Sequence, residues 1–282
     1  MKTRIAAYEA ARTRQQPEMG SRTLAAFLAL TFGLSWIPMA LFMLFPEPLT
    51  AVFGEISTSN PFFLLAVYAP GISGIFLVWR HYGWKGLGSF FRRLLLWRAP
   101  VQWWLFLLLG IPAIVYAAAA IIGTINDPFR FTPWYMVFPA LIQSLLLGPM
   151  GEEFGWRGLA LPLLQRRFSP FWASLVLGVV WAVWHAPAFL MSGTPQSAWS
   201  FGPFFIGLIA IAMIMTPLFN ASRGSLFIAI LYHLHIMNPI FPDAQPWDSF
   251  LFAIAAAVIV IMNRRQMFQR GSGVTDVVVP EE

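Results

Sequence analysis

The sequence predicts an all-α, polytopic membrane protein with about eight transmembrane helices in one bundle around a central polar cavity. Of its 282 residues, 58% are hydrophobic and only 11% are charged, whereas a soluble domain carries about 25% charged residues. Eight apolar stretches are close to the roughly 20 residues that a helix needs to cross a bilayer. Basic residues occur in every second connection between these stretches, as in cytoplasmic loops. These observations favour one helical membrane domain over soluble domains.

The predicted spans differ in length and in what they contain. The fourth is long and includes the charged motif GEEFGWRG, while the seventh is short and ends at Pro239 and Pro242. The eight spans cover residues 24–45, 61–79, 103–122, 134–164, 170–191, 201–219, 225–241 and 247–262.

The distribution of basic residues predicts that both termini lie in the cytoplasm. Lys and Arg cluster in the first 23 residues, in the connections after the second, fourth and sixth spans, and after residue 263. The other connections carry acidic residues, with Arg130 as their only basic residue. We therefore expect cytoplasmic tails at residues 1–23 and 264–282, the second ending loosely, on either side of a multi-pass domain at residues 24–263. The net charge of +6 fits this topology and does not indicate nucleic-acid binding.

The connection after the second span contains a further apolar pattern. In SFFRRLLLWR, Phe90, Leu94 and Trp97 follow one another at i, i+4 and i+7. This pattern predicts a short interfacial helix over residues 89–98, with its arginines directed toward lipid headgroups.

Ionisable residues within the spans are the candidates for function, because charges are costly inside a bilayer. In GEEFGWRG, Glu153 and Arg157 are i, i+4 neighbours, so we expect them to form a structural ion pair. Glu152 points about 100° away and has no basic partner on its own helix. A buried carboxylate of this kind can act as a general base. The alternative is that all three residues form a solvated helix end at the cytoplasmic surface.

Two other spans carry polar residues. The fifth contains His185 in WAVWHAPAF, and the seventh contains His233, His235 and Asn238 in LYHLHIMNP. His233 and His235 are about 200° apart on a helix, so they do not both face one site unless the helix is distorted. The alternatives are a buried neutral histidine in the fifth span and polar packing at a helix end in the seventh.

The three clusters reach similar depths. Counted at about 1.5 Å per residue from the expected cytoplasmic boundaries, Glu152 lies roughly 21 Å, His185 roughly 24 Å, His233 roughly 15 Å and Asn238 roughly 22 Å into the bilayer. This agreement favours one buried site in which Glu152 takes a proton from a water that His185 orients. His233 and Asn238 then donate hydrogen bonds to an oxyanion. The same Glu152, His185 and His233 are also a ligand set for one metal ion, and spacing does not choose between the two readings.

The three motifs, in this order, resemble those of the CPBP family of intramembrane proteases, which includes CAAX prenyl endopeptidases and Abi-like bacteriocin-processing or immunity proteins. GEEFGWRG resembles the family's EExxxR motif, and WAVWHAPAF resembles its FxxxH motif with Trp181 in place of Phe. GSLFIAILYHLHIMN resembles its HxxxN motif, although Asn238 comes one residue late. The similarity runs from about residue 133 to residue 239.

The resemblance implies roles for individual residues. Glu152 would be the base, accompanied by Glu153 and Arg157, with His185 and His233 as the histidines of the second and third motifs. Because the family is often described as metalloproteases, Zn²⁺ at Glu152, His185 and His233 is the alternative to a metal-free glutamate mechanism.

The sequence therefore predicts an intramembrane endopeptidase. Its partners would be membrane lipid and a peptide or lipidated protein, cleaved near the C-terminus of a prenylated (CAAX-type) or other membrane-associated substrate. A non-proteolytic immunity or scaffold protein of the same fold is the alternative, favoured by the displaced Asn238 and by Trp181. A transporter with a Glu–His proton relay is disfavoured, because the two halves of the chain show no repeat.

Overall fold

The computed structural model describes residues 19–279, and within this range the chain forms helices and turns but no strand. This confirms the predicted all-α fold. The predicted cytoplasmic tail at residues 1–23 lies largely outside the described residues. Within them, five helices are long and apolar enough to cross a membrane, and three shorter apolar helices match the remaining predicted spans. They are Ser21–Leu44, Pro61–Leu95, Val101–Ile122, Trp134–Gln165 and Phe201–Ala221, with Pro170–Trp184, Leu226–Ile236 and Trp247–Met262 as the shorter ones.

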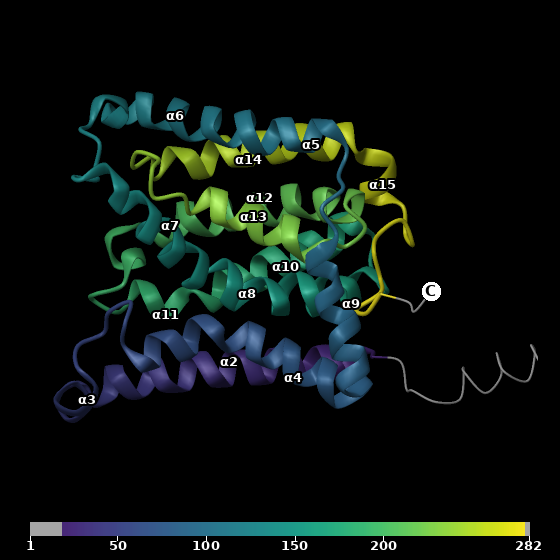
Figure 1. The fold of residues 1–282 in the computed structure, drawn as a ribbon, viewed down its shortest axis with the longest axis horizontal. Coiled ribbons are helices and arrows are strands. Elements are labelled where there is room, and N and C mark those ends of the chain that lie inside the picture. The colour runs from purple at the N-terminus through teal and green to yellow at the C-terminus, as the bar shows by residue number, and fades with distance from the viewer. Residues whose placement is uncertain (1–18, 280–282) are drawn as a thin grey trace, which may run out of the picture.

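The bundle is built mainly from α2 (Ser21–Leu44), α4 (Pro61–Phe91), α6 (Ile111–Ile122), α8 (Pro149–Gly155), α10 (Pro170–Trp184), α12 (Phe201–Ala221), α13 (Leu226–Ile236) and α14 (Trp247–Met262). Figure 1 shows α2 and α4 along one edge, α6 and α14 along the opposite edge, and the other four between them. The central helices are therefore shielded on both sides by helices that face lipid.

Short elements lie at the two ends of the bundle. Figure 1 places α3 (Pro46–Phe53) and α11 (Ala186–Phe189) at one end, and α9 (Leu161–Gln165) and α15 (Arg264–Phe268) at the other. The basic segments after α4, α9 and α14 share this second end. The arrangement agrees with the predicted even number of crossings, while the assignment of this end to the cytoplasm stays a prediction.

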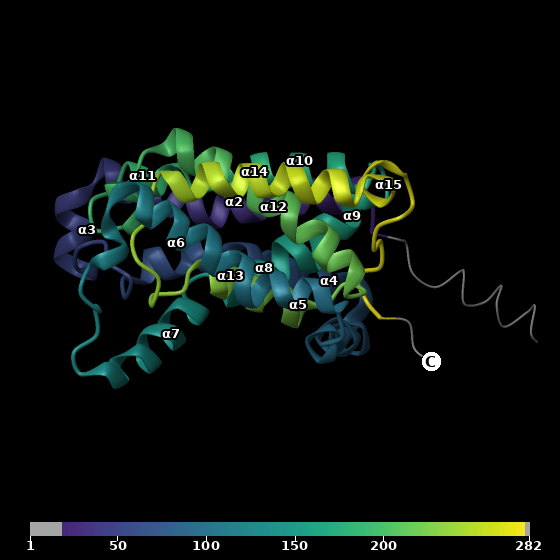
Figure 2. The same ribbon diagram turned by 90° about the horizontal axis from the view of Figure 1, so that it is seen from above.

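The fourth predicted span is not one continuous helix. It comprises α7 (Val137–Leu146), α8, a π-helical turn over Trp156–Ala160, and α9. The break lies at Gly148, whose backbone is not helical. The next residue is Pro149, and a proline disfavours helical geometry in the residue before it. Figure 2 shows α7 projecting away from the bundle, and none of its residues is buried. The charged motif therefore sits on a separate helix that begins inside the bundle.

The predicted interfacial helix at residues 89–98 is correct only in part. Gly83 has non-helical dihedral angles, so a separate helical segment follows it to Phe91, with a 3₁₀ turn over Arg92–Leu95. Figure 1 shows this segment running across the second end of the bundle, at an angle to the long helices. Arg92 is exposed as expected, but the Arg93 side chain is buried, with 2% of its surface exposed. Its guanidinium hydrogen-bonds to backbone carbonyls rather than to headgroups.

The described part of the predicted loose tail, up to residue 279, packs against the bundle, contrary to the prediction. The segment 273–279, here called the C-terminal strap, packs across the second end of the bundle as an extended chain. Gln165 Nε2 donates to the carbonyl of Val274 at 2.9 Å, and Arg166 Nε donates to that of Thr275 at 2.9 Å. Val277 is 1% exposed. The backbone carbonyls of the strap therefore accept hydrogen bonds from polar side chains of the bundle. The apolar pattern that predicts the spans gives no indication of these side chains.

Glycines allow a close helix contact between α4 and α8. Gly151 and Gly155 form a GxxxG pair, a spacing that lets helix backbones approach in membranes. A Cβ at Gly155 would lie 2.3 Å from the carbonyl oxygen of Pro70, and one at Gly151 would lie 2.8 Å from that of Val67. Since these obstacles are backbone atoms, neither position accepts a side chain without moving a helix.

We expect Gly155→Ala to lower the free energy of unfolding by about 1–3 kcal/mol, the usual cost of overpacking. Gly33→Ala is the matched control, because Gly33 lies in α2 with no atom within 4 Å of an added Cβ. Thermal unfolding in detergent measures both variants. Equal melting temperatures for the two would show that the α4–α8 contact is looser than described.

Candidate active site

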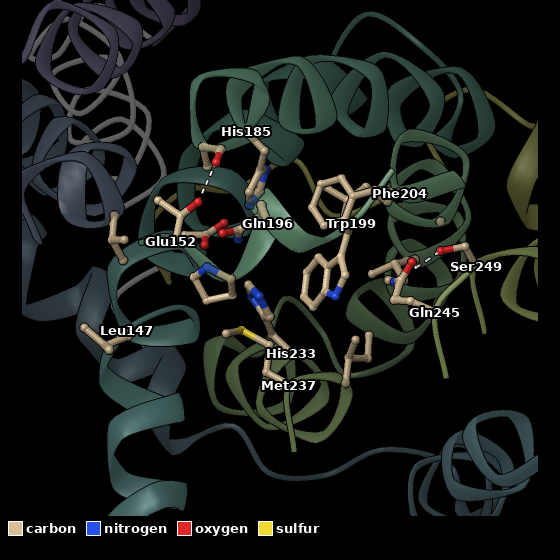
Figure 3. Close-up of a pocket in the computed structure, with 18 of the residues that line it drawn as sticks. Leu147, Glu152, His185, Gln196, Trp199, Phe204, His233, Met237, Gln245 and Ser249 are labelled. Atoms are coloured by element: carbon tan, nitrogen blue, oxygen red, sulfur yellow. Dashed lines mark hydrogen bonds between the residues drawn. The ribbon is translucent and has the colours of Figure 1, made fainter. Parts of the chain in front are cut away.

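The three polar motifs meet at one cavity of about 380 Å³ inside the bundle. Glu152 comes from α8, His185 from the end of α10, His233 from α13, and Asn238 from the turn after it. Figure 3 shows Glu152, His185 and His233 around the same space. The prediction that these residues share one site is confirmed as geometry, and the alternative of a solvated helix end for Glu152 is wrong, since it is 4% exposed.

Behind the cavity wall, Glu153 joins two cationic or potentially cationic partners. Arg157 Nη1 donates to Glu153 Oε1 at 2.9 Å, which is the predicted i, i+4 ion pair, and both side chains are at most 1% exposed. His233 Nδ1 lies 2.7 Å from the same oxygen. Because a carboxylate only accepts hydrogen bonds, Nδ1 of His233 carries the proton. Glu153 therefore fixes the orientation of the His233 ring and places a proton on its Nδ1.

Glu152 has a different environment from Glu153. The indole Nε1 of Trp181 donates to Glu152 Oε2 at 2.5 Å, and no basic side chain forms a salt bridge with Glu152 among the described residues. The face of the Trp181 ring also lies 4.2 Å from the Arg157 guanidinium carbon. One indole thus holds one oxygen of Glu152 and covers the neighbouring ion pair, leaving Oε1 of Glu152 for a ligand in the cavity.

His185 is held by the backbone of its own helix. Its Nδ1 lies 2.8 Å from the carbonyl oxygen of Trp181. A carbonyl accepts only, so Nδ1 is the donor, and Nε2 of the neutral ring keeps its lone pair. The helix ends at Trp184, just before His185, and Pro187 removes a backbone donor soon after it. The ring is thereby positioned to accept a hydrogen bond from a water in the cavity.

Asn238 reaches the cavity by leaving the helix. The helix of the third motif stops at Ile236, and Asn238 follows in a turn where its Oδ1 accepts from the backbone of Ile240 at 3.1 Å. Its amide nitrogen remains a donor that can face the cavity. Met237 occupies the position where the family motif places Asn, and it lines the cavity as well. His235 does not line this cavity and packs against Phe241 instead, as the helix geometry predicted.

The side chains as placed do not fit a three-ligand metal site. Within residues 19–279, no group of three His, Asp or Glu side chains has metal-binding geometry. Zn²⁺ at Glu152, His185 and His233 stays a prediction.

Sequence reasoning noted Trp181 only as a departure from a motif. Its role becomes visible when α8 and α10 are placed side by side, since the indole then bonds to Glu152. The signal in the sequence was Trp181 itself, a residue with an N–H donor at the motif position four residues before His185. The substitution of Trp for Phe therefore gives no argument against a functional site.

Comparisons with known proteins match the segment that carries the three motifs. Residues 132–238 match the family described as "Type II CAAX prenyl endopeptidase Rce1-like". A protein of Methanococcus maripaludis named "CAAX prenyl protease 2" is 29% identical over 144 residues, which cover 47% of this chain and 53% of that protein. The match thus spans about half the length of this curated relative. Through residues 132–238, which supply every residue of the site, the chain resembles the Rce1-like CAAX prenyl endopeptidases, and the resemblance predicted from its motifs is confirmed.

Proposed function

We propose that this protein is an intramembrane endopeptidase that hydrolyses a peptide bond near the C-terminus of a prenylated, CAAX-type substrate or another membrane-associated one. The observation that carries the proposal is the meeting of Glu152, His185 and His233 at one cavity within the bundle. The match of the surrounding segment to CAAX prenyl endopeptidases supports the choice of reaction.

In the proposed mechanism, Glu152 Oε1 takes a proton from a water molecule while His185 Nε2 accepts the second hydrogen bond of that water. The water oxygen adds to the carbonyl carbon of the scissile bond, and the carbonyl electrons move onto its oxygen. Nε2 of protonated His233 and the amide of Asn238 donate hydrogen bonds to this oxyanion. When the tetrahedral intermediate collapses, the C–N bond breaks, and the proton on Glu152 passes to the leaving amine.

Each polar group behind the cavity has a supporting part in this mechanism. Glu153 orients the His233 ring through Nδ1, and Arg157 balances the single negative charge of Glu153. Trp181 keeps Glu152 aimed at the water through its other oxygen. The apolar lining, which includes Trp184, Trp199 and Phe204, restricts bulk water and so strengthens these electrostatic interactions.

The first test is a cleavage assay with a prenylated peptide and the detergent-solubilised protein, run with and without a chelator. We expect cleavage that survives the chelator, because the described residues form no three-ligand cluster. Loss of cleavage with the chelator and its return on adding Zn²⁺ would instead support a metal mechanism. An absence of cleavage, with partners that still co-purify with a Glu152→Gln variant, would favour the scaffold function.

A further inference from the structure

A π-helical turn, Trp156–Ala160, directly follows the helix that carries the two glutamates. Single turns of this kind are rare and occur frequently at functional sites. Arg157 belongs to this turn, so its direction toward Glu153 depends on how the turn is held.

One buried side chain, that of Arg93, holds this turn from outside. Its Nη1 donates to the carbonyl oxygen of Gly158 at 2.8 Å, and its Nη2 donates to that of Arg157 at 3.3 Å. Both acceptors belong to the π-helical turn. The hydrogen bonds therefore fix the backbone of the residue that forms the ion pair with Glu153.

The same guanidinium also holds the start of the helix that carries His233. Arg93 Nε donates to the carbonyl oxygen of Gly224 at 2.8 Å, in a turn where Gly224 has a positive φ of 80°. The next residue, Ser225, caps α13 by accepting from the amide of Ile228. A fourth bond, from Nη1 to the carbonyl of Val277 at 3.0 Å, attaches the C-terminal strap.

Arg93 forms no ion pair at contact distance with any described residue, although the Asp276 carboxylate of the C-terminal strap is close enough to interact with it electrostatically. The guanidinium lies between the rings of Phe90 and Phe219, at 5.7 and 5.3 Å. A buried charge is costly unless it is hydrogen-bonded, so its four carbonyl contacts are what stabilise it there. Such an arginine joins backbone segments rather than pairing with another charge.

We propose that Arg93 is a positioning residue for the reaction proposed above, on which this inference rests. It sets the π-helical turn and the start of α13 relative to one another, so that Arg157 and His233 both reach Oε1 of Glu153. Inside the site, Glu153 contacts side chains from both the π-helical turn and α13. Outside the site, Arg93 bonds to the backbone of that turn and to the residues just before α13.

The test compares Arg93→Met with Arg92→Met, its exposed neighbour on the same turn. We expect Arg93→Met to lower kcat at least tenfold with KM changed less than about threefold, because the substrate cavity itself is intact. Arg92→Met should match the wild type. Arg93→Lys keeps the positive charge but has a single nitrogen, so it reaches fewer carbonyls and should give an intermediate kcat. This variant also tests the proposal if Arg93→Met does not fold.

A second readout separates positioning from mere stability. The chain has only 4 histidines, so the proton on His233 Nδ1 can be followed by NMR of ¹⁵N-histidine-labelled protein and assigned with Glu153→Gln. In Arg93→Met or Arg93→Lys the resonance should shift or broaden while the protein stays folded. An unchanged resonance with wild-type kcat per folded molecule overturns the inference. If the wild type cleaves no peptide, the proposed function fails, and the resonance alone decides the role of Arg93.

Discussion

Replacing Glu152 with Gln should lower kcat by about 10³-fold, within the range that a general base contributes. The amide retains the shape of the carboxylate and can still accept from Trp181, so the fold should be unaffected. It cannot take a proton from water, and the reaction then lacks its base. Initial rates on a prenylated peptide, with the folded fraction measured by size-exclusion chromatography, give the result.

Two further variants frame this prediction. His185→Ala removes the second acceptor for the attacking water and should also abolish measurable hydrolysis. Glu47→Gln changes an exposed carboxylate on α3 and should leave the rate unchanged. Wild-type rates in both Glu152→Gln and His185→Ala would show that these residues are not catalytic.

Arg157→Met should lower the free energy of unfolding by about 3–5 kcal/mol, the usual cost of removing one partner of a buried ion pair. In this variant Glu153 keeps its contact with His233 but loses the Arg157 guanidinium, which balances its negative charge. The Glu153 carboxylate would stay fully buried. Thermal unfolding in detergent measures the loss, and the exposed Arg167→Met is the control.

The double variant Glu153→Gln/Arg157→Met sharpens this second prediction. Removing both charges should recover part of the stability, because no uncompensated carboxylate then stays buried. A melting temperature for Arg157→Met within about 1 °C of the wild type would contradict the described burial of the pair.

The parts of the fold and site that the sequence predicted depend on local patterns. Apolar runs near bilayer length located the five long apolar helices and the three shorter ones, and the i, i+4 spacing located the pair Glu153 and Arg157. Similar depths in separate spans were enough to group Glu152, His185 and His233. In each case the information is carried by spacing within one helix or by distance from a membrane boundary.

The parts that escaped prediction depend on contacts between distant segments. Arg93 has the local pattern of a headgroup-facing arginine, and its carbonyl acceptors come from three separate stretches of chain. The C-terminal strap has no helical period, and its partner side chains, which include Gln165, Arg166 and Asn220, lie 54 or more residues earlier. The bond from Trp181 to Glu152 requires the rotation of α10 relative to α8, which no single-helix pattern encodes.

The central claim is that His185 and His233 face one cavity beside Glu152. The chain has no cysteine, so His185→Cys/His233→Cys carries the only two thiols, and a short bifunctional thiol reagent in native membranes tests their proximity. A matched control is His81→Cys/His233→Cys, since His81 contacts Thr23 away from the cavity. We expect an intramolecular cross-link in the first pair and none in the control. No cross-link between positions 185 and 233, in protein whose thiols react singly, would contradict the shared site.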